Sequence, residues 1–274
     1  MLNRFDPEIV LAAIEKYKAT DIFLVPTALN FFFNSPDFGK YDISSLSTVL
    51  YTGAPMPVEL LKRVRSSMGN IFVQLYGSTE SWGISVLSKE DHIDITSPRL
   101  NSVGKAYSDV EIKIADDDDK AQDIGEVGEI TVKSASVMNE YLGMEETTAA
   151  ILKNGWYHTG DMGFLDKDGY LFISGRKDEM IISGGLHIYP VELEEVIGAH
   201  PAVLEVAVIG VPDPDWGQEP RAIVVLKKGQ TATADELMEF CRARLSSFKR
   251  PRSVVFTDEL PRTSTGKVLK RILR

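Results

Sequence analysis

Four short segments carry the residues whose types and spacing could do chemistry. In the first, an apolar run leads directly into Gln74-Leu-Tyr-Gly-Ser-Thr-Glu80. A tyrosine there offers a face on which a base can stack, hydroxyls can hydrogen-bond a phosphate, and a carboxylate can hold Mg²⁺ against phosphate oxygens. By itself the segment is equally consistent with a glycine turn and a capping Ser or Thr before a helix.

The other three segments follow in order along the chain. Gly155-Trp-Tyr-His-Thr-Gly-Asp161 ends on an aspartate that can accept hydrogen bonds from both ribose hydroxyls. Gly175-Arg-Lys-Asp178 precedes a Gly184-Gly185 pair, so an arginine that can bind phosphate or ribose lies near backbone that a ligand can approach closely. Pro261-Arg-Thr-Ser-Thr-Gly-Lys267 places a lysine on a glycine-containing loop, where an isolated lysine is usually surface decoration.

The ordered set resembles the adenylate-forming superfamily of acyl-CoA synthetases, luciferases and peptide-synthetase adenylation domains. The resemblance spans nearly the whole chain, because Phe5-Asp-Pro-Glu8, Val25-Pro26 and Tyr51-Thr-Gly-Ala-Pro55 are also similar to family segments. Met180-Ile-Ile-Ser-Gly-Gly185 favours the acyl-CoA synthetase type. The resemblance implies an acid–thiol ligase that converts a carboxylic acid, ATP and CoA to acyl-CoA, AMP and diphosphate through an acyl-adenylate, with Mg²⁺.

The resemblance also implies roles for the nucleotide-binding residues of the first part of the chain. Gly53, Ala54 and Pro55 would line the adenine pocket, and Tyr76 would stack on the base. Gly77 and Ser78 belong to the same binding segment. Thr79 would meet the α-phosphate, and Glu80 would hold Mg²⁺.

The remaining implied roles fall later in the sequence. Asp161 would bind the ribose hydroxyls, and Arg176 would contact ribose or phosphate. Lys267 would bridge the reacting carboxylate and the α-phosphate, where negative charge accumulates. Asp178 matches the hinge about which the small domain of this family rotates between two half-reactions, and Gly184 and Gly185 would line the pantetheine tunnel.

The hydrophobic pattern predicts an α/β and α+β fold. Strands alternate with helices from Pro7 to Leu75, which indicates a parallel sheet; the expected helices are 7–17 and 57–68, and the expected strands 22–25, 49–51 and 71–75. Short alternating strands then follow, at 110–114 and 129–132. We therefore expect a partial α/β subdomain at 1–98, a β-rich subdomain at 99–174, a hinge at 175–178 and an α+β lid at 179–274, with helices at 190–197 and 234–245 and strands at 204–209 and 222–226.

Composition limits the classes of partner. The formal charge of −10 argues against general nucleic-acid or anionic-membrane binding and favours small-molecule partners. The single cysteine, Cys241, excludes an intramolecular disulfide framework. The N-terminus has no signal-peptide pattern, and no apolar run reaches the roughly 20 residues of a membrane-spanning helix. A cytoplasmic location is expected.

The family's phosphate-gripping loop is expected before Phe5, so the resemblance implies a truncated chain that holds the C-terminal half of the enzyme. Two alternatives stay open. The chain could be a non-catalytic nucleotide-binding or interaction fragment, or a peptide-synthetase-type adenylation domain. Surface exposed by truncation predicts self-association. The substrate acid is undetermined, although Phe31 to Phe33 and Trp82 hint at an apolar wall.

Several residues have an ordinary structural interpretation that we prefer. For Trp216 we expect local loop packing rather than a place at the tunnel mouth, and for His187 an imidazole satisfied by loop backbone. The Asp116 to Asp119 run is typical of a solvated turn rather than a metal site. The cluster Lys249, Arg250 and Arg252 is at least as consistent with a solvated basic face as with a site for CoA phosphates.

Overall fold

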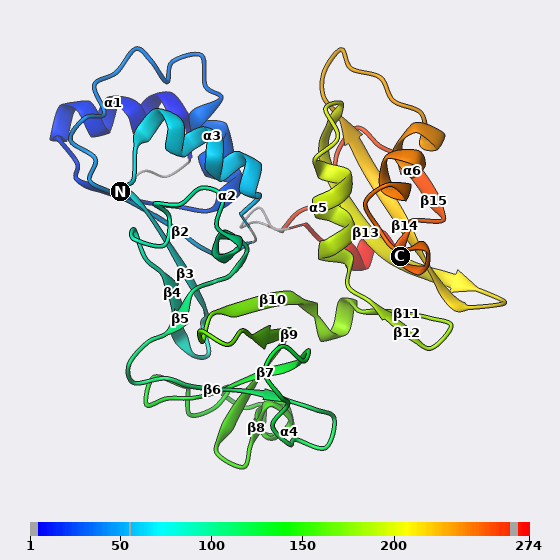
Figure 1. Ribbon diagram of the computed structural model, residues 1–274. Helices are drawn as coiled ribbons and strands as arrows, with labels where there is room; N and C mark the ends of the chain where they lie inside the picture. The colour runs from blue at the N-terminus through cyan, green and yellow to red at the C-terminus, as the bar shows by residue number, and fades with distance from the viewer. Residues whose placement is uncertain (1–4, 55, 264–267) are drawn as a thin grey trace. The chain divides into compact units, whose positions relative to one another are not determined.

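The computed structural model describes residues 5–54, 56–263 and 268–274 (Figure 1). The chain divides into two compact units. The first unit consists of residues 1–159 and 163–173, and the second of residues 160–162 and 174–274. This division falls beside the expected hinge at 175–178. The finer boundary at residue 98 and the hinge itself stay predictions.

The first unit begins with a five-stranded sheet in the order β1-β2-β3-β4-β5. The strands are β1 (Asp21–Leu24), β2 (Thr48–Tyr51), β3 (Phe72–Ser78), β4 (Trp82–Leu87) and β5 (Lys105–Ala106). The pairs β1–β2 and β2–β3 are parallel, as the alternation of strands and helices predicted. The pairs β3–β4 and β4–β5 are antiparallel, which the sequence pattern did not reveal.

Three helices pack on this sheet: α1 (Pro7–Tyr17), α2 (Pro26–Phe33) and α3 (Val58–Met68). Helix α1 starts where it was expected, because Asp6 Oδ1 accepts hydrogen bonds from the backbone amides of Glu8 (3.1 Å) and Ile9 (3.4 Å). Helix and strand side chains share one core. Helix α2 was not predicted. It places Phe32 in that core and leaves Phe31 exposed, so the three phenylalanines do not form one continuous wall.

The β-rich part of the first unit is a second sheet in the order β10-β9-β7-β6, with β8 paired to β9. Its strands are β6 (Glu111–Ala115), β7 (Gly128–Lys133), β8 (Leu152–Lys153), β9 (Trp156–Leu165) and β10 (Leu171–Arg176). Short helical segments accompany it: a 3₁₀ turn at Pro98–Asn101 and α4 (Glu145–Ile151). The expected strands at 110–114 and 129–132 are thus confirmed as β6 and β7.

The second unit is the expected α+β fold, a sheet in the order β12-β11-β14-β13 with β15 paired to β14. Its elements are β11 (Ile181–Ser183), β12 (Leu186–Ile188), α5 (Pro190–Gly198), β13 (Val203–Asp213), β14 (Gly217–Leu226), α6 (Ala234–Arg242) and β15 (Ser253–Phe256). The 3₁₀ turns η2 (Lys177–Glu179), Ser247–Lys249 and η4 (Lys270–Ile272) complete it.

Alternation along β13 explains how this sheet builds a core on each face. Val208 belongs to the core that contains Leu193 of α5 and Leu237 of α6. Its neighbours Ala207 and Ile209 point to the opposite face, into a core that contains Leu260. The helices therefore cover one face, and the segment around Leu260 covers the other.

Candidate active site

The Tyr76–Glu80 segment is a β-hairpin and not a turn before a helix. Tyr76, Gly77 and Ser78 end strand β3, Thr79 and Glu80 form the turn, and β4 returns antiparallel, with Ser78 opposite Trp82. A Cβ atom at Gly77 would lie 1.9 Å from the carbonyl oxygen of Trp82. No side chain fits there, so Gly77 is fixed by the close approach of two backbone strands.

The side chain and backbone of Glu80 are both held by the segment that follows β7. The Tyr141 hydroxyl donates to Glu80 Oε1 at 2.6 Å, and the Met138 amide donates to the Glu80 carbonyl oxygen at 2.6 Å. The hydrogen bond to the Glu80 carboxylate raises the pKa of Tyr141 to about 12, with burial adding to the shift. The predicted magnesium ligand is therefore pre-positioned by a residue 61 positions away in the sequence.

The donor set around Glu80 fits magnesium in the form that nucleotide enzymes use. Mg²⁺ is commonly bound by one or two carboxylates plus substrate phosphates and waters, rather than by an all-protein cage. Glu80 supplies one carboxylate, and within residues 5–54, 56–263 and 268–274 the structure contains no group of three or more His, Cys, Asp or Glu side chains that could hold a metal ion. A single carboxylate of this kind would need substrate phosphates and waters to complete the ligand set of Mg²⁺.

The hydroxyls near the turn form a second network. Ser78 Oγ lies 3.1 Å from Ser81 Oγ and 3.3 Å from the Tyr157 hydroxyl. Ser136 Oγ donates to the Ser81 carbonyl oxygen at 2.8 Å. Tyr76 is partly buried and packs against the core of the β-rich part. Side chains of strand β9 and of the segment that follows β7 therefore help to fix the conformation of the hairpin.

The predicted adenine-pocket residues follow β2. Strands β2 and β3 are parallel neighbours, with Tyr51 opposite Gln74, so their carboxyl ends meet at the same edge of the sheet. Thr52 Oγ1 donates to the Leu75 carbonyl oxygen at 2.5 Å and ties the two ends together. Gly53, at φ 86°, and Ala54 are exposed beside this tie. Pro55 lies outside the described residues.

In the second unit the structure brings Asp161 and Arg176 together. Arg176 Nη1 lies 2.9 Å from Asp161 Oδ1, and Arg176 Nε lies 3.4 Å from Asp178 Oδ1. Gly160, at φ 72°, leaves room for the guanidinium, because a Cβ there would lie 3.1 Å from Arg176 Nη2. The two residues predicted to contact ribose are thus neighbours, although they are 15 positions apart in the sequence.

The Gly-Gly pair forms the turn of the β11–β12 hairpin, with φ values of 57° for Gly184 and 80° for Gly185. The Gly184 amide donates to the Trp216 carbonyl oxygen at 2.9 Å, and a Cβ at Gly184 would lie 2.5 Å from the Trp216 ring. The indole also receives the Arg252 guanidinium at 5.3 Å from a ring centroid. The preferred interpretation of Trp216 as local packing agrees with these contacts. His187 lies exposed on β12.

The predicted catalytic lysine, Lys267, lies outside the described residues, but the chain on both sides of it is anchored. Arg262 and Val268 form an antiparallel bridge, and the Leu269 amide donates to the Pro261 carbonyl oxygen at 2.8 Å. Part of the basic cluster is engaged within the fold: Lys249 pairs with Glu192 at 2.6 Å, and Arg250 donates to the Leu245 and Arg242 carbonyl oxygens.

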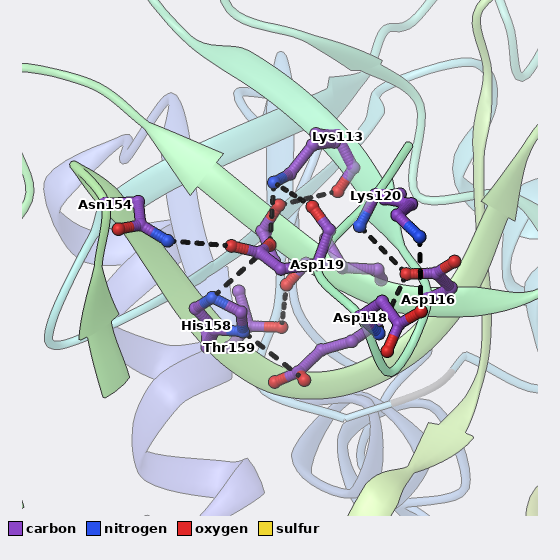
Figure 2. A network of polar contacts seen from close by, with 11 residues as sticks. Lys113, Asp116, Asp118, Asp119, Lys120, Asn154, His158 and Thr159 are labelled. Atoms are coloured by element: carbon purple, nitrogen blue, oxygen red, sulfur yellow. Dashed lines mark hydrogen bonds and ion pairs between the residues drawn. The ribbon is translucent and has the colours of Figure 1, made fainter. Parts of the chain in front are cut away.

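The acidic run at 116–119 is a turn, as expected, but its last member is not simply solvated (Figure 2). Asp116 Oδ1 accepts from the amides of Asp118 and Lys120, as in an ordinary surface turn. Asp119 instead binds Lys113 Nζ at 2.7 Å and lies 3.8 Å from the Nε2 atom of His158, a side chain that is only 9% exposed. The run therefore helps to join β6 to β9.

Sequence reasoning missed the residues that hold the predicted site in place. Tyr141 and Tyr157 contact Glu80 and Ser78, and Lys270 lies between Glu179 and Glu194. Tyr157 lies inside the Gly155–Asp161 segment that the sequence singled out, four positions before Asp161, the residue chosen there for its chemistry. Tyr141 and Lys270 lie outside the segments that the sequence singled out.

Comparison with known proteins decides the family. The family model described as AMP-binding enzyme matches residues 2–142, and the model of the AMP-binding enzyme C-terminal domain matches residues 192–267. This chain belongs to the AMP-binding enzyme family. The predicted resemblance to adenylate-forming ligases is thereby confirmed.

Relatives within the AMP-binding enzyme family include ligases of carboxylic acids and CoA. The chain is 41% identical to a feruloyl-CoA synthase of Amycolatopsis over 273 residues, which cover 99% of this chain and 55% of that protein. It therefore spans about half the length of the curated relatives that it matches.

Solved structures of the family share the fold. The amide bond synthetase McbA of Marinactinospora thermotolerans superimposes with a TM-score of 0.94 at 37% identity, over 100% of this chain and 55% of that one. The o-succinylbenzoate CoA synthetase of Bacillus subtilis, in complex with its acyl-adenylate intermediate, superimposes with a TM-score of 0.87 at 36% identity, over 99% of this chain and 54% of that one. The predicted mixed α/β fold class is confirmed.

The structure also bears on the question of membrane-spanning helices. None of the described helices is both long enough and apolar enough to cross a membrane. The cytoplasmic location and the self-association stay predictions.

Proposed function

We propose that this chain carries the adenylate-binding and thiol-transfer machinery of an ATP-dependent acyl-CoA synthetase. In the first half-reaction a carboxylate oxygen attacks the α-phosphorus of ATP and diphosphate leaves. In the second, the sulfur of CoA attacks the acyl carbon and AMP leaves. One observation carries the proposal: the segment Gly53–Ala54 after β2 and the Tyr76–Glu80 hairpin after β3 lie at the same edge of the sheet, where Thr52 bonds Leu75. The 41% identity to a feruloyl-CoA synthase supports it.

For the first unit we propose roles that its geometry supports. Tyr76 offers an aromatic face to adenine, and the open Gly53–Ala54 backbone leaves space beside that face. Thr79, in the hairpin turn, provides a hydroxyl for the α-phosphate. Glu80 would hold Mg²⁺, which when bound neutralises charge on the phosphate oxygens. Because Tyr141 already orients the Glu80 carboxylate, little conformational freedom is lost on binding.

The second unit supplies the ribose contacts and the charged lysine. A carboxylate accepts several hydrogen bonds at once, so Asp161 can bind ribose hydroxyls while it keeps Arg176 in place. Lys267 would stabilise the charge that accumulates between the carboxylate and the α-phosphate. Gly184 and Gly185 present backbone without side chains, as a narrow pantetheine passage requires.

A test separates the two half-reactions. Feruloyl-adenylate and CoA are supplied to the 274-residue chain, and feruloyl-CoA is measured by chromatography. The reverse of the first step, formation of ATP from feruloyl-adenylate and diphosphate, is measured in parallel. We expect Lys267→Ala to slow the reverse adenylation by on the order of 10²–10³ and to leave thioester formation largely intact.

Two outcomes would contradict the proposal at different levels. Equal losses in both half-reactions would show that the role of Lys267 is wrong. Thioester formation no faster than in the absence of protein would show that the chain does not carry the transfer machinery.

The amide bond synthetase among the structural neighbours favours a second candidate, in which an amine replaces CoA as the acceptor of the acyl group. The same assay distinguishes the two. Replacement of CoA by a primary amine should give little product if the acceptor is a thiol, and should give an amide at a comparable rate if the acceptor is an amine.

A further inference from the structure

A buried lysine in the second unit lies between two carboxylates from different segments. Lys270 Nζ is 2.7 Å from Glu179 Oε2 and 2.8 Å from Glu194 Oε1, and its side chain is only 14% exposed. Glu179 ends the 3₁₀ turn η2 directly after Asp178, the predicted hinge residue. Glu194 lies on helix α5. One cation therefore joins the hinge turn, a helix and the C-terminal segment.

Glu194 is itself held by the sheet. Its Oε1 atom accepts a hydrogen bond from the Val208 amide of β13 at 2.7 Å, so the carboxylate is tied to both helix and strand. Burial raises the pKa of Glu194, and the Lys270 charge opposes that shift. Lys270 therefore pairs with a carboxylate that is itself held between helix α5 and strand β13.

The segment that carries Lys270 is closed by further contacts on the same unit. Val268 pairs with Arg262 across the base of the loop, and Val268 and Leu273 pack on the core that contains Leu260. Arg274 Nη2 donates to the Asp178 carbonyl oxygen at 3.2 Å, a second link to the hinge turn. Residues 268–274 are therefore tied both to Arg262 and to the turn at Lys177–Glu179.

Another ion pair on the same helix provides the contrast. Lys249 Nζ lies 2.6 Å from Glu192 Oε2, but the two side chains are 28% and 42% exposed. Exposed pairs contribute little and break easily, whereas removal of one partner from a buried pair leaves a charge without compensation. Lys270 and Lys249 thus offer a less exposed and a more exposed version of one interaction, since the Lys270 and Glu179 side chains are 14% and 29% exposed.

We propose that Lys270 is a positioning residue that ties residues 268–274, which directly follow Lys267 in the sequence, to the predicted hinge turn at Asp178. The inference rests on the proposed function for the role of Lys267. The tie between residues 268–274 and 177–180 rests on the contacts of Lys270 and Arg274 and does not depend on the proposed function. An anchor directly after Lys267 in the sequence would limit the positions that its ammonium group can take.

The first experiment tests the tie without any substrate. Hydrogen–deuterium exchange is measured by mass spectrometry on the 274-residue chain and on Lys270→Met and Lys249→Met. We expect Lys270→Met to speed exchange at least tenfold in peptides from both 177–180 and 268–274, and Lys249→Met to change neither. Faster exchange in only one of the two segments, or in neither, would overturn the proposal.

A milder variant covers the case in which Lys270→Met does not fold. Glu179→Gln keeps a hydrogen-bond acceptor and leaves the Lys270–Glu194 pair intact, while it weakens only the link to the hinge turn. We expect faster exchange at 177–180 with 268–274 affected less. Unchanged exchange at 177–180 would overturn the proposal as well.

The second experiment tests the placement of Lys267. An adenosine that carries an aryl sulfonyl fluoride at its 5′ end is used as the probe; the lysine amine attacks sulfur, fluoride leaves and a stable sulfonamide remains. We expect labelling at Lys267, and an approximately tenfold slower rate in Lys270→Met at unchanged AMP affinity. Lys249→Met should label at the unaltered rate.

The labelling results distinguish a failure of the positioning role of Lys270 from a failure of the proposed function. An equal rate in Lys270→Met and the unaltered chain would overturn the positioning role. Absence of AMP binding and of labelling in the unaltered chain would overturn the proposed function, while the exchange experiment would still decide whether Lys270 makes the tie.

Discussion

Two hairpins of this molecule place a glycine against a tryptophan, and they differ in what surrounds them. At the β3–β4 hairpin, Gly77 faces the backbone carbonyl of Trp82, and side chains from two other segments hold the turn. At the β11–β12 hairpin, Gly184 faces the indole ring of Trp216, and the neighbouring Gly185 and Leu186 are exposed. The first hairpin is held by hydrogen bonds from side chains of two other segments, whereas the second packs against Trp216 and leaves its turn exposed.

The difference matches the tasks that we propose for the two hairpins. A site for a nucleotide benefits from groups that are already oriented, because each group ordered on binding costs free energy. A passage for a flexible thiol arm benefits from open backbone with room on one side. The comparison therefore predicts that the first hairpin tolerates change poorly and the second tolerates it better.

Substitution of the two hairpin glycines by alanine is expected to cause the largest loss of stability. Gly77→Ala should lower the free energy of unfolding by about 3 kcal/mol, because its Cβ would overlap backbone that cannot move aside. Gly184→Ala should cost about 1–2 kcal/mol, the penalty of a left-handed conformation, since a half-exposed indole can yield. Urea unfolding followed by circular dichroism measures both. Gly39→Ala, with no atom within 4 Å of its Cβ, serves as the control.

We expect Gly77→Ala to destabilise the chain more than Gly184→Ala. If Gly184→Ala destabilised the chain as much as Gly77→Ala, the second hairpin would be as tightly fixed as the first, and the contrast between a preformed and an open site would fail.

Removal of the Tyr141 hydroxyl is expected to cause a smaller loss of stability, and that loss should depend on pH. Its folded-state pKa of about 12 lies above the ordinary value of 10, so the hydrogen bond to Glu80 stabilises the fold fully below pH 10 and loses that contribution as the pH rises toward 12. Tyr141→Phe should therefore cost about 1.5 kcal/mol at pH 8. The difference from the unaltered chain should shrink at pH 11.

Urea unfolding at the two pH values measures this prediction. Tyr17→Phe is the control, because that side chain is 71% exposed and its removal should have little effect at either pH. A Tyr141→Phe cost that stays constant between pH 8 and 11 would mean that the Glu80 contact does not shape the hairpin.

Sequence reasoning succeeded where the signal is local. The helix expected at 7–17 is confirmed as α1 (Pro7–Tyr17), and the Asp6 carboxylate caps its first turn. The parallel part of the first sheet followed from strands that alternate with helices. The residues proposed for chemistry were found because they stand together in short segments of unusual composition.

Long-range partners could not be predicted in the same way. Tyr141 meets Glu80 across 61 residues, and Lys270 meets Glu179 across 91 residues. A single tyrosine or lysine has no periodic neighbours that would mark it, and its partner is set by the path of the sheets. The antiparallel return of β4 was missed for a related reason, since Ser and Gly near the turn are typical of several kinds of connection.

The most direct test of the account is calorimetric titration of the 274-residue chain with AMP in the presence of Mg²⁺, repeated on Asp161→Asn and Asp178→Asn. The account predicts binding at one site, an affinity roughly tenfold lower in Asp161→Asn because a charge-assisted hydrogen bond to ribose is lost, and little change in Asp178→Asn, whose side chain is 75% exposed. Absence of AMP binding by the folded chain, or equal affinity in all three proteins, would contradict it.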